Sequence, residues 1–76
     1  MSWQDRITVD PKVLVGKPII RGTRIAVELI VELYAEGWTP EQILSNYPNL
    51  TGDDLLAALG YASERLKSER LYPLPV

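Results

Sequence analysis

The sequence predicts a mainly α fold, a helix-turn-helix bundle of three helices preceded by a short N-terminal β arm. Two observations carry this prediction. After residue 25, apolar residues recur at helical spacing in three stretches that turn and capping residues separate. Before residue 26, the apolar runs are short and β-branched. We expect one domain, made of an arm over 1–25, a three-helix body over 26–70 and an extended tail over 71–76.

The arm begins with a predicted strand at residues 6–9, where isoleucine and valine alternate with polar side chains. Asp10-Pro11 then marks a turn. Two brief apolar runs follow, at 13–15 and 19–20, which either pair as a hairpin or cover the body. Because Pro18 lacks an N–H, it favours an edge strand at the second run.

The first helix is predicted over 26–36, because apolar residues there share one face and Gly37 follows as a C-terminal cap. The second begins at Thr39, which can form a capping box with Gln42, and ends before Pro48. The third begins after Thr51 and continues to about residue 69. Three helices joined by tight turns match a helix-turn-helix arrangement.

Charge is distributed unevenly along a chain whose net charge is only −2. Residues 1–26 hold five cations against two acids, whereas residues 27–60 hold six acids and no cation. A basic arm on an acidic body is expected to contact either a polyanion or the acidic body of a second copy.

Composition argues against catalysis. The chain has no histidine and no cysteine, which removes the commonest general base and the thiolate nucleophile. The acids Asp53 and Asp54 complement the dipole of the third helix better than they form a metal site. We therefore predict no enzyme activity, no cofactor and no metal. No apolar run approaches the roughly 20 residues that span a bilayer, so we expect a cytoplasmic protein without membrane contact.

Nucleic-acid binding would have to use cations outside the start of the third helix, because that start is acidic and would repel phosphates. The candidate contacts to DNA or to a protein partner lie in the arm and near the end of the third helix. They are Lys17, Arg21, Arg24, Arg65 and Lys67. The alternative is that Arg21 and Arg24 pair with glutamates of the same chain or of a second copy.

Self-association is also predicted. The first helix carries two apolar stripes, which is more than one small core covers, and such surplus area marks interfaces. We expect a homodimer whose contacts include Leu29, Leu33 or the 13–20 segment.

One continuous string, Gly-Lys-Pro-Ile-Ile-Arg-Gly-Thr-Arg-Ile at 16–25, resembles a known bacterial family. So do the later strings Gly-Trp-Thr-Pro-Glu-Gln-Ile-Leu at 37–44 and Tyr-Pro-Asn-Leu-Thr at 47–51. The family is domain-of-unknown-function family four-thirty-three, small proteins similar to VapB-type antitoxins. Its signature corresponds here to Gly16, Lys17, Pro18, Gly22, Thr23 and Arg24.

The resemblance implies a homeodomain-like or winged-helix-like fold. It also implies an antitoxin that binds a PIN-like ribonuclease toxin and represses its own promoter by binding double-stranded DNA. We therefore expect a small non-catalytic regulator, the antitoxin-like member of a toxin–antitoxin pair. The alternative is a protein-interaction module, for a dimer or a toxin, that binds no nucleic acid.

Overall fold

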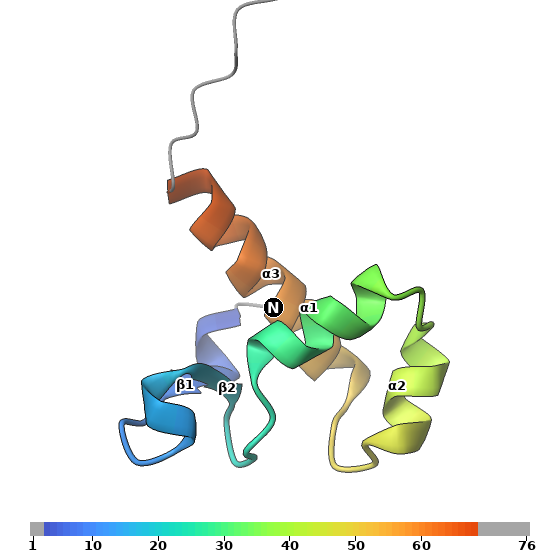
Figure 1. Ribbon diagram of the computed structural model, residues 1–76, viewed down its shortest axis with the longest axis horizontal. Coiled ribbons are helices and arrows are strands. Elements are labelled where there is room, and N and C mark those ends of the chain that lie inside the picture. The colour runs from blue at the N-terminus through green and yellow to red at the C-terminus, as the bar shows by residue number, and fades with distance from the viewer. Residues whose placement is uncertain (1–2, 69–76) are drawn as a thin grey trace, which may run out of the picture.

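A short antiparallel hairpin and three helices make up residues 3–68, the residues that the computed structural model describes (Figure 1). The strands are β1 (Ile7–Val9) and β2 (Pro18–Ile20), and the helices are α1 (Val27–Ala35), α2 (Pro40–Asn46) and α3 (Gly52–Ser68). Two 3-10 turns, η1 (Trp3–Asp5) and η2 (Leu14–Gly16), precede the two strands. The fold is thus mainly helical, and the predicted tail over 71–76 lies outside the described residues.

The hairpin aligns Ile7 with Ile20 and Val9 with Pro18. The strand predicted at the start of the arm is confirmed, and so is the second strand at Pro18. Besides its pairing with β1, β2 forms an isolated antiparallel bridge between Ile19 and Ala26. A backbone hydrogen bond of 2.7 Å from the Arg21 N–H to the Arg6 oxygen continues the pairing past the strands.

The apolar run at 13–15 departs from both alternatives predicted for it. It does not pair with 19–20, because Ile7 and Ile20 both enter the core and so make β1 the partner of β2. It does not cover the body either, because Val15 is 95% exposed. Leu14 and Val15 instead adopt the left-handed conformation, with φ values of 51° and 56°, in the loop that joins the strands.

The helix ends follow the predicted capping residues. Gly37 has a φ of 93°, and the N–H of Trp38 donates to the Leu33 oxygen, which is the bond that closes a Schellman motif after α1. Thr39 and Gln42 form the expected capping box at the start of α2. The start of α3 repeats this arrangement with Thr51 and an aspartate, described below.

The core draws its most deeply buried side chains from four elements: Ile20 of β2, Ile30 of α1, Ile43 of α2 and Leu55 of α3. The arm is therefore part of the core rather than an appendage. Leu33, which the sequence assigns to a dimer contact, is only 7% exposed and packs in this core, so that assignment is corrected. Its burial follows from the i, i+3 spacing that places it beside Ile30.

Candidate interaction site

The segment 16–24 has glycines and a threonine at positions where the backbone shape requires them. Gly16 and Gly22 have φ values of 77° and 81°, which other residues rarely adopt. Gly22 lies in a turn closed by the Thr23 N–H, which donates to the Ile20 oxygen at 3.0 Å. The Thr23 hydroxyl donates to the same oxygen at 2.8 Å and accepts from the Ile25 N–H at 3.0 Å. The segment is thus a rigid connection between β2 and α1.

Arg6 of the arm pairs with the acidic start of α3. Its Nη1 lies 3.0 Å from Oδ1 of Asp54, and its Nη2 lies 3.4 Å from Oδ2 of Asp53. Asp54 is 7% exposed, and its other oxygen accepts from the Thr51 N–H at 3.0 Å while the Thr51 hydroxyl accepts from the Asp54 N–H. Asp54 therefore caps α3 and holds the arm. Sequence reasoning treated it only as a complement to the helix dipole, because nothing in the pattern identifies a partner 48 positions away.

Lys17 pairs with Glu28 in the first turn of α1. The hydrogen bond that Lys17 donates to the Glu28 carboxylate, and then the negative charge of Glu28, raise the pKa of Lys17 above its ordinary value. Two of the five cations in the arm thus meet the acidic body of their own chain, through Arg6 and Lys17. The expected contact between basic arm and acidic body is, for these two residues, internal.

The other candidate cations stay exposed. The Arg21 guanidinium donates to the backbone oxygen of Asp5 at 3.2 Å. Within residues 3–68, no ion pair includes Arg21, Arg24, Arg65 or Lys67. The structure separates them into two groups, since Arg21 and Arg24 flank the Gly22 turn while Arg65 and Lys67 lie in the last turns of α3.

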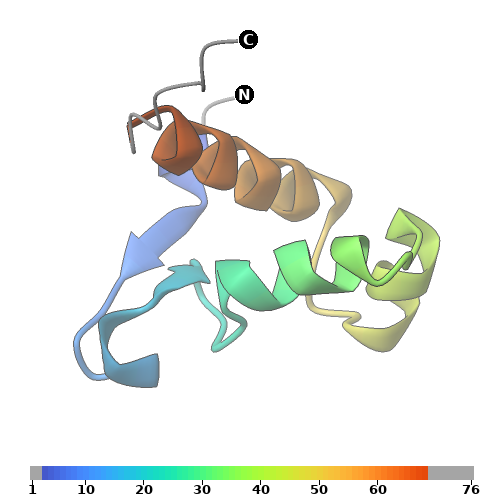
Figure 2. The same ribbon diagram turned by 45° about the horizontal axis from the view of Figure 1, so that its top comes forward.

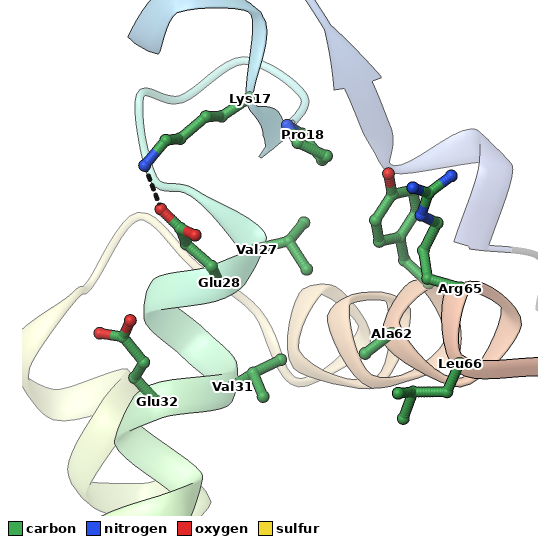
Figure 3. A pocket seen from close by; sticks show the side chains of 10 residues that line it. Lys17, Pro18, Val27, Glu28, Val31, Glu32, Ala62, Arg65 and Leu66 are labelled. Atoms are coloured by element: carbon green, nitrogen blue, oxygen red, sulfur yellow. Dashed lines mark hydrogen bonds and ion pairs between the residues drawn. The ribbon is translucent and has the colours of Figure 1, made fainter. Parts of the chain in front are cut away.

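A groove of about 550 Å³ lies between α1 and the second half of α3. In Figure 3, Val27 and Val31 of α1 point toward Ala62 and Leu66 of α3, and these side chains form an apolar floor. One wall carries Glu32 and the Lys17–Glu28 ion pair, which together leave one negative charge, while Arg65 stands on the opposite side. Sequence reasoning singled out Arg65 and Lys17, but it did not bring them to one groove, because the angle between α1 and α3 is not readable from spacing.

A smaller hollow of about 310 Å³ is lined by Asp5, Arg6, Arg21 and Asp54. Its two cations face two acids, so it carries no charge that would select an anion or a cation.

Within residues 3–68, no three side chains that could ligate a metal ion come together. Burial, and then the charge of Glu41, raise the pKa of Tyr34 above its ordinary value, which moves it further from neutrality. None of the described helices is long and apolar enough to cross a bilayer. The described residues do offer an apolar groove with charged edges and a hydrogen-bonded turn that carries two arginines.

The comparisons with known proteins assign the family. Residues 7–62 match the family described as "Protein of unknown function (DUF433)", so the chain belongs to that family. A crystal structure of a DUF433 member from Anabaena variabilis, at 2.00 Å resolution, is similar with a TM-score of 0.79 and 37% identity. That match covers 86% of this chain and 64% of the other.

Two sequence relatives are themselves uncharacterized. The protein y4eO of Sinorhizobium fredii is 34% identical over 56 residues, which is 74% of this chain and 25% of that protein. A protein of Archaeoglobus fulgidus is 55% identical over 29 residues, 38% of this chain and 81% of that protein. The chain thus spans a quarter of y4eO and under two thirds of the solved chain.

Proposed function

We propose that this chain is a small non-catalytic regulator that acts by binding another protein, as the antitoxin-like member of a toxin–antitoxin pair in the cytoplasm. The observation that carries the proposal is the groove between α1 and α3. An apolar floor with an acidic wall and a basic one suits an amphipathic segment of a partner, whose apolar side fills the floor and whose charges meet the walls. The resemblance to antitoxins makes a PIN-like ribonuclease the partner to test first.

The test is co-expression of the tagged chain with the product of the neighbouring gene, followed by co-purification and by measurement of growth and RNA cleavage. We expect a stable complex that suppresses the cleavage. Glu32→Arg and Arg65→Glu, which reverse one charge on each wall, should weaken capture at least about tenfold. Glu64→Arg is the matched control, because Glu64 is exposed on the same helix as Arg65 but does not line the groove.

Failure of the wild-type chain to retain the neighbouring product would remove the antitoxin proposal. If both wall variants retained the neighbouring product as well as the wild type does, the partner would stand but its binding surface would lie outside the groove.

A second function, promoter binding, is favoured by the exposed arginines of the Gly22 turn. In this alternative the three helices form a homeodomain-like or winged-helix-like helix-turn-helix domain. Arg21 and Arg24 then supply the DNA contacts from their rigid turn. The first turn of α3 would not insert into the major groove of the DNA, because the exposed carboxylate of Asp53 in that turn would repel the phosphates.

Fluorescence anisotropy with the upstream DNA of the gene, over a range of salt concentrations, tests this second function. Removing both arginines, Arg21→Ala with Arg24→Ala, should weaken binding and reduce the salt slope by about two. The matched control removes the same charge from α3, through Arg65→Ala with Lys67→Ala. Equal losses from the two double variants would indicate non-specific attraction, and no binding at low salt would exclude the function.

A further inference from the structure

The outer face of α3 carries large apolar side chains that residues 3–68 leave uncovered. Leu56, Leu59 and Leu66 are 60%, 39% and 64% exposed. With Ser63 they follow spacings of three, four and three residues, which are the a and d positions of a heptad and form a straight stripe on a helix. We call these four residues the α3 seam.

The α3 seam faces outward, and only its last residue, Leu66, also borders the groove between α1 and α3. The inner face of α3 is occupied, because Leu55, Ala57 and Ala58 are buried in the core. On another side, Trp3 packs against α3 near Gly60. Figure 2 shows α3 along one border of the molecule, with α1 on its inner side. The face that carries the seam lies between these two contacts and is open.

We propose that the α3 seam is the interface between two copies of this chain. The two α3 helices run antiparallel, and the two-fold axis that relates them crosses the seam at the level of residue 61. In that register, Leu56 of each copy packs against Leu66 of the second copy, and Leu59 packs against Ser63. Such a contact is isologous, because each pair occurs twice. It lies on a different helix from the dimer contacts that the sequence suggested at Leu29 and Leu33.

Charge on the flank of the α3 seam selects the antiparallel arrangement. Asp53 and Lys67 both occupy heptad position e. They therefore lie on the same side of the seam, at its opposite ends. Two antiparallel helices in this register place Asp53 of each copy beside Lys67 of the other. Asp53 is available, since its side chain is 59% exposed and its contact with Arg6 is a long 3.4 Å. Parallel helices would instead bring the two acidic N-terminal turns and their dipoles together.

The contact is short, and its affinity should be modest. Four residues from each copy bury less than about 1,200 Å² in total, the low end for specific interfaces. We therefore expect a dimer that dissociates in the micromolar range. The inference does not depend on the proposed function: Leu66 also borders the groove between α1 and α3, but Asp53, Leu56 and Lys67 do not line it.

The test measures the mass of the full chain by sedimentation equilibrium over a range of concentrations. Leu56→Asp should raise the dissociation constant at least about tenfold, because it places a charge in the seam. Asp53→Lys and Lys67→Asp should each raise it several-fold, and the double variant with both changes should restore it, because the pair is rebuilt with its signs exchanged. Glu64→Lys alters an exposed charge outside the seam on the same helix and should leave the dissociation constant unchanged.

Circular dichroism melting of every variant at low concentration separates dissociation from unfolding, since all four substituted residues are exposed. A wild-type chain that stays monomeric at about 100 µM would overturn the proposal. The proposal would also be overturned if the double variant had a dissociation constant as high as those of the two single variants. That result would mean that Asp53 and Lys67 do not contact each other. A dimer that Leu56→Asp leaves intact would place the interface on another face.

Discussion

The two halves of α3 have similar apolar spacing but different surroundings. In residues 52–59 the helix is packed into the core, and Leu55 is 2% exposed. In residues 60–68 it is covered only in part, and Leu66 is 64% exposed. The reason is length: α1 has 9 residues and α3 has 17, so α3 is longer by about 12 Å. Periodicity defines a face of a helix, and the length of the neighbouring element decides how much of that face is covered.

The largest test of this contrast replaces one leucine in each half. Leu55→Ala should lower the free energy of unfolding by about 3 kcal/mol, because it opens a cavity in the core. Leu66→Ala, eleven positions later on nearly the same side of the helix, should lower it by less than about 0.5 kcal/mol. Urea denaturation at low protein concentration measures both. Similar losses would mean that the second half of α3 is packed as tightly as the first.

A second test compares the two neighbouring acids at the start of α3. Asp54→Ala should cost about 2 kcal/mol, because it removes the bond to the Thr51 N–H and the ion pair with Arg6. Asp53→Ala should cost about 0.5 kcal/mol, since an exposed acid contributes mainly through the helix dipole. Thermal and urea denaturation of both variants check the difference. Equal costs would show that burial of Asp54 adds nothing to its role as a cap.

The smallest expected effect is at Gly60, where the two halves of α3 meet. A Cβ there would lie 3.3 Å from Cδ1 of Trp3, which is tight. Alanine is favoured over glycine within a helix by about 0.8–1.0 kcal/mol, and a small shift of the partly exposed Trp3 relieves the contact. Gly60→Ala should therefore stabilise the chain by a few tenths of a kcal/mol.

A rise of about 2 °C in melting temperature would report that gain. Gly52→Ala is the control, because a Cβ at Gly52 contacts nothing within 4 Å. A drop in melting temperature for Gly60→Ala alone would mean that Trp3 is held rigidly against α3.

Much of the fold is predictable because its signals are local. The capping box of Thr39 and Gln42 and the glycine at 37 each act within a few residues, so the sequence defines them without knowledge of the fold. The pairing of β1 with β2 was missed because three intervening apolar residues, 13–15, have the same composition as a strand. Only the left-handed φ values of Leu14 and Val15 remove them from the sheet.

The candidate site was less predictable, because its geometry depends on contacts between distant residues. The sequence identifies Arg21, Arg24, Arg65 and Lys67 as cations but cannot show which of the eight cations of the chain are neutralised internally. Arg6 was not among the candidates, yet it pairs with two acids of α3. The groove likewise requires the crossing of α1 over α3, which no spacing within either helix encodes.

The pair of Arg6 and Asp54 also bears on the order of folding. It joins two residues 48 positions apart. Closing so long a loop costs conformational entropy, and the ion pair offsets that cost only once both ends are ordered. We expect β1 and the first turn of α3 to form together and late, and to melt in one cooperative step. During synthesis, β1 then has to wait until α3 has left the ribosome. Cooperative folding of this domain should accordingly follow the emergence of α3 rather than that of the arm.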